Sequence, residues 1–240
     1  DENGKLAKQF TNDGLHLKGD GYLLWKHIVY PYVFDLNSKP SLLPKPQQQI
    51  WIKGYFPLTA TNTIFVENPA LMKEGLALQK AMKLKGLDVE LTNKKPEKDN
   101  FISLQLAKVN APLNSTEAYN LKATANRVTL TANTPNGIQN GIQTLLQLMR
   151  DNVSVDATEI TDWPAFAWRG FMVDVGRNYQ SMKLLKQQID VMAAYKMNIF
   201  HFHPTEDIAW RLQSKLYPQL TNPEYMLRDK GEYYTENDLK

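Results

Sequence analysis

Three absences limit what this chain of 240 residues can do. It contains no cysteine, which excludes disulfide bonds and thiol chemistry but leaves the cellular compartment undecided. No apolar run approaches the roughly 18 residues that a membrane-spanning helix requires, so we expect no membrane span. The formal net charge of +3 is too small to indicate a nucleic-acid partner. The 42% of hydrophobic residues is enough for one or two packed cores.

The most informative segment is predicted to fold as strand, helix, strand. Residues 170–175 form an apolar run that includes Asp174 and precedes Arg177, as expected of a strand buried on both faces. Ser181 can cap the following helix, in which apolar residues recur at helical spacing. A second apolar strand is expected at residues 199–203. This order is typical of a parallel α/β barrel, in which the active face lies at the carboxyl ends of the strands.

Polar side chains gather at and beyond the end of the second strand. His201 and His203 are two residues apart and project on the same side, and Glu206 and Asp207 follow in the loop. The two histidines can be packed barrel residues, or they can share a zinc ion. The second interpretation predicts a metal-dependent TIM-barrel hydrolase.

Several motifs occur in a fixed order along the chain. The downstream motifs are residues 162–170 (DWPAFAWRG), Asp174 with Arg177, residues 195–198 (YKMN) and residues 201–207 (HFHPTED). Together they resemble the start of the catalytic domain of family 20 glycoside hydrolases, the β-N-acetylhexosaminidases. The upstream segments 43–46 (LPKP), 54–56 (GYF), 117–121 (EAYNL) and 141–148 (GIQTLLQL) resemble the N-terminal α+β domain of that family.

The resemblance implies a two-part fold. We expect an α+β domain at residues 47–160, with helices on one side of an antiparallel or mixed sheet, after a linker at residues 36–46. Residues 161–240 then form the first βαβ part of an incomplete (β/α)₈ TIM barrel. Within the α+β domain the residue pattern predicts helices from Pro69 and Pro135, strands at 87–91 and 101–106, and a hairpin of residues 119–124 and 128–132. A joint between the two parts is expected near residues 151–162.

The resemblance also implies the roles of individual residues. Arg169 is expected to grip sugar hydroxyls, because the planar fork of a guanidinium can hold two vicinal hydroxyls at once. Spacing alone leaves open that Arg169 is a structural cation paired with Asp174 or Glu206. Asp174, His203, Glu206 and Asp207 are expected to support the active site. The resemblance implies neither a cofactor nor a metal.

The catalytic pair of the family is absent from the downstream part of the chain. A complete barrel needs about 250 residues, whereas 79 residues run from Asp162 to Lys240. Family members use an adjacent Asp-Glu pair in a substrate-assisted, retaining mechanism, and no such step follows Asp162. We therefore expect a fragment, inactive alone, of a β-N-acetylhexosaminidase that removes terminal GlcNAc or GalNAc from glycans. The alternative is a non-catalytic carbohydrate-binding or accessory module.

The N-terminal residues resemble a second family. Residues 1–35 are similar to the carboxyl end of SGNH (GDSL-type) esterases, which implies that Asp13 and His16 are remnants of a catalytic triad. We expect the parent to be a larger esterase–hexosaminidase fusion, located outside the cytoplasm, in the periplasm or secreted. Barrel strands without neighbours expose apolar faces and unpaired edges, so self-association or packing against the α+β domain is expected.

Overall fold

The computed structural model describes residues 19, 21, 22, 24, 25, 39–60, 63–112, 115–149 and 152–240. Contacts divide the chain into two units, Asp1–Leu42 and Leu43–Lys240, and the fold below belongs to the second. Asp13 and His16, the residues that resemble an esterase triad, lie outside the described residues.

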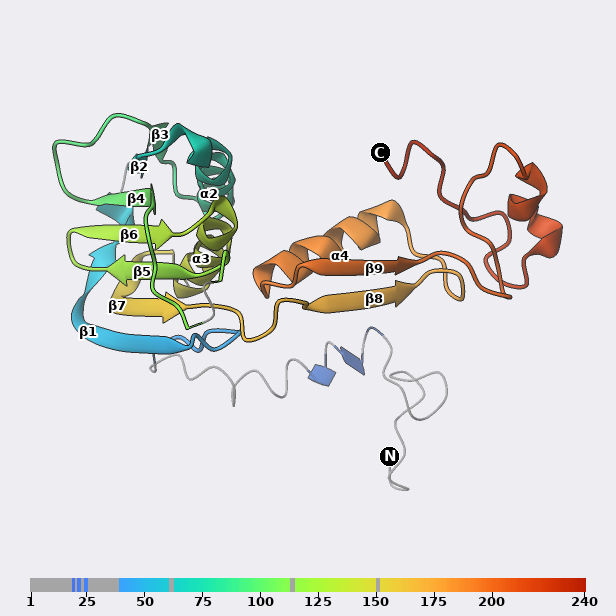
Figure 1. The fold of residues 1–240 in the computed structure, drawn as a ribbon, viewed down its shortest axis with the longest axis horizontal. Helices are drawn as coiled ribbons and strands as arrows, with labels where there is room; N and C mark the ends of the chain where they lie inside the picture. Colours follow the sequence, from blue (N-terminus) through green and yellow to red (C-terminus); the bar gives the residue numbers. More distant parts are fainter. Residues whose placement is uncertain are drawn as a thin grey trace, which may run out of the picture. The chain divides into compact units, whose positions relative to one another are not determined.

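The first part of the second unit is a mixed seven-stranded sheet with the order β1-β7-β5-β6-β4-β2-β3 (Figure 1). Neighbours from β1 to β6 are antiparallel, and those from β6 to β3 are parallel. The hairpin predicted from the sequence is confirmed, with Leu121 opposite Leu130. The strands are β1 (Gln48–Pro57), β2 (Thr63–Val66), β3 (Glu90–Thr92), β4 (Phe101–Leu106), β5 (Tyr119–Ala123), β6 (Arg127–Ala132) and β7 (Ser154–Asp162).

Two helices cover one face of this sheet, as the resemblance implied (Figure 1). The 3₁₀ turn η2 (Pro69–Leu71) leads into α2 (Met72–Leu84), and the side chain of Asn68 caps it by accepting from Ala70 N. The second helix, α3 (Pro135–Leu148), starts at the predicted proline. A Cβ atom at Gly141 would clash with Leu130 Cδ1, so α3 packs directly on β6. A short 3₁₀ turn, η1 (Leu58–Ala60), follows β1.

Two details of the predicted α+β domain are wrong. The joint expected near residues 151–162 is instead strand β7, which pairs with β1 on one side and β5 on the other. Its buried residues include Val155, Ala157 and Ile160, but Ala157 and Ile160 are three positions apart and Thr158 is also buried, so the sequence shows no strict alternation. The strand predicted at 87–91 lies at Glu90–Thr92, because the chain leaves α2 through Gly86, which has a left-handed φ of 81°.

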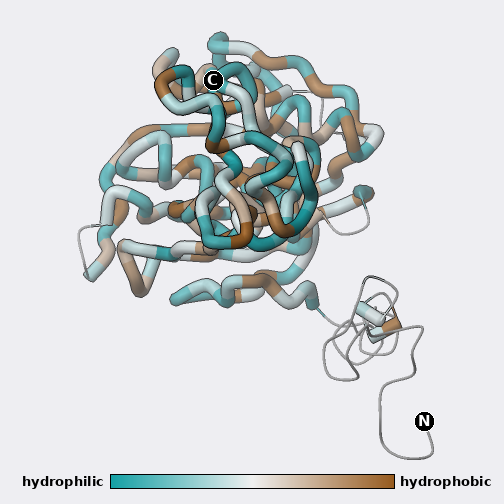
Figure 2. Tube along the Cα trace, turned by 90° about the vertical axis from the view of Figure 1, so that its right-hand side faces the viewer, coloured by the Kyte–Doolittle hydropathy of each residue, from teal (hydrophilic) through white to brown (hydrophobic). Residues whose placement is uncertain are grey.

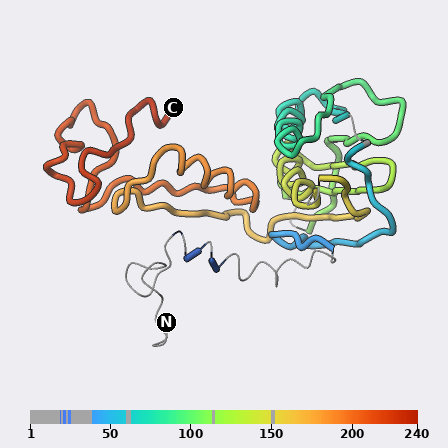
Figure 3. Tube along the Cα trace, turned by 180° about the vertical axis from the view of Figure 1, so that it is seen from behind, coloured from blue at the N-terminus to red at the C-terminus, as the bar shows by residue number. Residues whose placement is uncertain are grey.

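The predicted βαβ unit is confirmed. Strand β8 (Gly170–Asp174) is followed by α4 (Met182–Ala194) and then by β9 (Ile199–His203). The two strands are parallel, with Gly170 opposite Ile199 and Asp174 opposite His203. Figure 3 shows, from behind, the chain running from β8 through α4 to β9 and on to loops with two 3₁₀ turns, η3 (Pro218–Thr221) and η4 (Pro223–Tyr225). A complete barrel has eight such strands.

The outer surfaces of β8 and α4 keep apolar side chains in solvent. Phe171 is 43%, Met172 52% and Val191 56% exposed. Figure 2 shows hydrophobic residues, in brown, interspersed with hydrophilic ones along the chain. In the described part of the chain, no helix is both long and apolar enough to cross a membrane.

Candidate functional site

Four polar side chains meet at the carboxyl ends of β8 and β9. We call them the carboxyl-end cluster: Asp174, Arg177, His203 and Glu206. Arg177 lies between the two carboxylates, with Nε 3.2 Å from Asp174 Oδ2 and Nη2 3.2 Å from Glu206 Oε1. His203 Nε2 lies 3.4 Å from the same Glu206 oxygen. Three of these residues were predicted to support an active site, and they do lie together.

The backbone explains why these side chains meet. Parallel pairing sets Asp174 beside His203, and the amides of Val175 and Gly176 both donate to the carbonyl of His203. A Cβ atom at Gly176 would lie 2.9 Å from the amide nitrogen of Glu206, a distance that real Cβ atoms avoid. Glycine at this position therefore lets the turn after β8 approach the loop after β9.

A buried arginine holds the loops around the cluster. Arg211 has no exposed surface, and its guanidinium lies 3.6 Å from the Asp229 carboxylate. Because it binds backbone on both sides, Arg211 fastens the turn after β8 to the segment at residues 228–232. The carbonyls that accept its hydrogen bonds belong to Val175, Gly176, Arg228, Asp229 and Glu232.

Two tyrosines pack beneath these loops. The rings of Tyr179 and Tyr234 stack with centroids 5.1 Å apart, and the Tyr234 hydroxyl donates to the carbonyl of Gln180 at 2.7 Å. Burial raises the pKa of Tyr234 to about 12. This hydroxyl is therefore a structural hydrogen-bond donor at neutral pH.

The geometry argues against a metal ion at the cluster. Ligand atoms of Asp174, His203 and Glu206 all lie within 4.8 Å of one another, a spacing that could hold a cation. However, the Arg177 guanidinium already contacts both carboxylates, and a second cation beside it would be repelled. The zinc interpretation required His201 together with His203, but His201 is exposed and is not part of this group. Asp207, also predicted to support the site, is exposed.

Arg169 lies at the opposite end of β8, directly before the first residue of the strand. Its guanidinium donates to both oxygens of Glu117, at 2.6 and 3.1 Å, and to the carbonyls of Phe166 and Lys196, both at 2.7 Å. Four of its five donors are thus used. A sugar-gripping role at the active face does not fit this position, and pairing with Asp174 or Glu206 is also wrong. Arg177, by contrast, does lie at the carboxyl end of β8.

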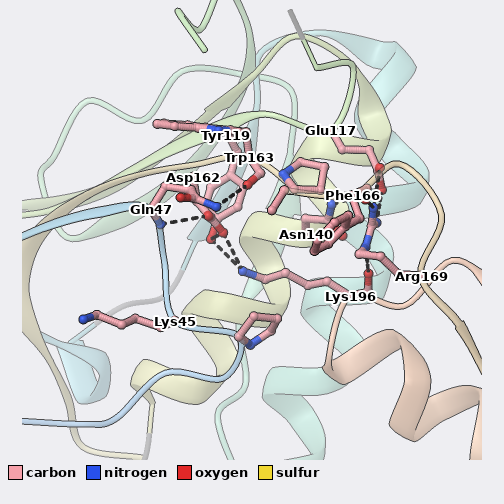
Figure 4. Close-up of a pocket in the computed structure, with 13 residues that line it drawn as sticks. Lys45, Gln47, Glu117, Tyr119, Asn140, Asp162, Trp163, Phe166, Arg169 and Lys196 are labelled. Carbon is pink, nitrogen blue, oxygen red and sulfur yellow. Dashed lines mark hydrogen bonds and ion pairs between the residues drawn. The ribbon is translucent and has the colours of Figure 1, made fainter. Parts of the chain in front are cut away.

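A second buried network joins the barrel strands to the α+β part (Figure 4). The Lys196 ammonium, 7% exposed, donates to Asp162 Oδ2 and to the Tyr119 hydroxyl, both at 2.9 Å. Burial lowers the pKa of Lys196, although Asp162 opposes this shift. Burial and the Asp162 charge raise the pKa of Tyr119. With the Arg169–Glu117 pair, this network ties the residues that precede β8 and β9 to the α+β domain, but it leaves the apolar residues Phe171 and Met172 of β8 exposed.

Comparison with known proteins identifies the family. The model for the catalytic domain of glycosyl hydrolase family 20 matches residues 166–240, and the model for domain 2 of that family matches residues 39–163. The chain belongs to glycosyl hydrolase family 20. Both family 20 models together span nearly all of the second unit, in the order that the motifs predicted.

Relatives and solved structures of family 20 enzymes agree. A beta-hexosaminidase from Porphyromonas gingivalis is 40% identical over 51% of this chain and 16% of its own length. One from Vibrio furnissii is 31% identical over 83% of the chain and 34% of its own. The solved chitobiase of Flavobacterium johnsoniae matches with a TM-score of 0.67 and 27% identity, over 83% of this chain and 32% of its own. The chain thus spans about a third or less of these proteins.

Proposed function

We propose that the chain forms part of an exo-acting β-N-acetylhexosaminidase that removes terminal GlcNAc or GalNAc from glycans. The observation that carries this proposal is the match of both family 20 domains in order. Relatives named beta-hexosaminidase share this region, and a Streptomyces plicatus beta-hexosaminidase that is 25% identical was solved with GlcNAc as its product. No adjacent Asp-Glu pair follows Asp162 in the sequence, so the chain contributes part of the site and not the catalytic carboxylates.

Within the proposed site, Arg177 is the residue that binds the sugar. Its side chain is 61% exposed, so part of the guanidinium faces solvent while Asp174 and Glu206 hold the rest. A guanidinium held in this way presents its remaining N–H groups in a fixed direction, which suits two neighbouring hydroxyls of a pyranose. Asp174 and Glu206 orient Arg177, and His203 lies beside Glu206.

The test uses a longer protein that contains this chain and the remaining barrel strands. Hydrolysis of an aryl β-GlcNAc is measured for the unchanged enzyme, for Arg177→Ala and for Arg169→Ala. Loss of hydrogen bonds from a charged group costs about 1.5–3 kcal/mol, so Arg177→Ala should lower kcat/KM by about 10- to 150-fold. Arg169→Ala should mainly lower stability, because its partners are protein groups.

The matched control is Arg127→Ala, which removes an exposed arginine of β6. It should leave kcat/KM unchanged. Failure of the unchanged enzyme to hydrolyse any β-N-acetylhexosaminide would refute the proposed activity. Unaltered kcat/KM in Arg177→Ala would refute the role of that residue while leaving the activity intact.

A further inference from the structure

A pocket opens where the α+β part meets the start of the barrel (Figure 4). Its volume is about 290 Å³, close to the lower end of the range for small-molecule sites. Its walls come from segments far apart in sequence, including Gln47 before β1, Asn140 on α3, and Trp163 and Phe166 in the connection to β8. The pocket lies near the amino ends of β8 and β9, whereas the carboxyl-end cluster lies at the other ends.

A buried ammonium group at the pocket wall has one hydrogen-bond donor to spare. Lys196 lines the pocket and is 93% buried, since 7% of its surface is exposed. Two of its three N–H groups are taken by Asp162 and Tyr119. No oxygen among the described residues accepts the third. Because a buried donor without an acceptor is costly, the pocket suits a molecule that offers an oxygen atom to Lys196.

The buried charges of the pocket are already balanced, and the remaining charged residue of its lining, Lys45, is exposed, where an ion pair contributes little. Glu117 is paired with Arg169, and Asp162 is paired with Lys196. A charged ligand would therefore have to compete with a bidentate pair or with a buried one. A neutral ligand would not. This balance favours a molecule that carries hydroxyl groups and no charge.

The remaining walls of the pocket consist of amide and aromatic side chains. The amide nitrogens of Gln47 and Asn140 make long hydrogen bonds, both 3.4 Å, to Trp163 O and Glu117 Oε1, so each can be exchanged for a ligand hydroxyl. Trp163 and Phe166 provide aromatic surface, and Phe166 is 74% exposed. Ring faces offer apolar contact to the C–H groups of a sugar, and amides bind its hydroxyls.

We propose that this pocket, between the α+β part and the start of the barrel, binds one neutral pyranose residue of a glycan. The inference does not rest on the proposed catalysis, because it uses only groups near the amino ends of the strands. It predicts that the chain has sugar affinity without the rest of the barrel.

The experiment records indole N–H signals by NMR while the full chain is titrated with GlcNAc and, separately, with glucose. The Trp163 signal is assigned from its loss in Trp163→Phe. We expect a saturable shift of this signal with at least one of the two sugars. Phe166→Ala should weaken binding about five- to tenfold, as expected for a lost ring contact. Asn140→Ala should also weaken it.

The matched control is Trp168→Ala, which removes a ring of the same segment that is also 74% exposed but does not line the pocket. It should leave the sugar affinity unchanged. The proposal is overturned by the absence of a saturable shift with either sugar, or by equal effects of Phe166→Ala and Trp168→Ala. It is equally overturned if acetate or phosphate, but neither sugar, shifts the signal. In the longer protein, Phe166→Ala should keep the hydrolytic activity that Arg177→Ala loses, so the two proposals can fail separately.

Discussion

The buried pair between Asp162 and Lys196 should be the strongest single link between the two parts of the fold. The two side chains are 10% and 7% exposed, and their charged atoms are 2.9 Å apart. With an effective dielectric constant of about 20, the attraction at this distance is about 6 kcal/mol before desolvation is subtracted. Removing one partner leaves a buried charge uncompensated, which typically costs about 3–5 kcal/mol. We expect Asp162→Asn to lower the free energy of unfolding by this amount and Lys196→Met to lower it by somewhat less.

The difference between the two variants follows from what each leaves behind. In Lys196→Met, Asp162 still accepts from Gln47 N and from the Tyr119 hydroxyl. In Asp162→Asn, the ammonium of Lys196 loses the charge that raises its pKa, while burial continues to lower it. The double variant removes both charges. Its loss in free energy of unfolding should be smaller than the sum of the two single losses by at least about 2 kcal/mol.

The pH dependence of Asp162→Asn provides an internal check. Burial already holds the pKa of Lys196 below its ordinary value of 10.5, and loss of the Asp162 charge should lower the pKa further in the folded variant. Between these two pKa values the unfolded state binds more protons, so the free energy of unfolding increases as the pH rises. The loss caused by Asp162→Asn should therefore be largest near neutral pH and shrink in alkaline solution.

Equilibrium urea unfolding is followed by tryptophan fluorescence for the unchanged chain, the two single variants and the double variant. Together these measurements give the coupling free energy between Asp162 and Lys196. The pair of Lys122 and Glu159 is the control, because its atoms are also 2.9 Å apart but its side chains are 50% and 43% exposed. Its coupling should stay below about 1 kcal/mol. Additivity of Asp162→Asn and Lys196→Met within about 0.5 kcal/mol would refute the reasoning.

Three further predictions concern the carboxyl ends of β8 and β9. Arg211→Lys should lower the free energy of unfolding by about 3 kcal/mol or more, because an ammonium cannot reach five carbonyls. The same variant should speed hydrogen exchange at residues 228–232, and unchanged exchange would contradict this. The pKa of Tyr234 is about 12 in the folded protein and exceeds its ordinary value of 10, so the free energy of unfolding should fall as the pH rises from 10 to 12. Unfolding measured across this pH range should show a smaller fall in Tyr234→Phe. Elemental analysis of the purified chain should find no stoichiometric metal, because Arg177 occupies the space between the carboxylates; a bound ion at Asp174 and His203 would disprove that interpretation.

Two other expectations stay predictions. Self-association is consistent with the exposed apolar residues of β8 and α4, and size-exclusion chromatography with light scattering measures it directly. The extracytoplasmic location rests on the family resemblance alone.

The sequence by itself determined the local elements and the family. Ser181 accepts from Leu184 N, as a capping residue should, and Pro135 is the first residue of α3, so the starts of both helices could be read from single residues. The parallel βαβ unit followed from two apolar runs around one amphipathic helix. These features depend on residues that are close in the chain, whose spacing is visible in the sequence.

Only the tertiary structure decided which charged groups face each other. Arg169 and Arg177 are eight positions apart in the sequence, but β8 separates them, so one binds Glu117 and the other lies in the carboxyl-end cluster. The sequence motif that contains Lys196 did not indicate its partners, which the fold shows to be Asp162 and Tyr119. Such partners come from strands and loops distant in sequence, and the free energy of a charge depends on burial and on its neighbours, which spacing along the chain does not specify.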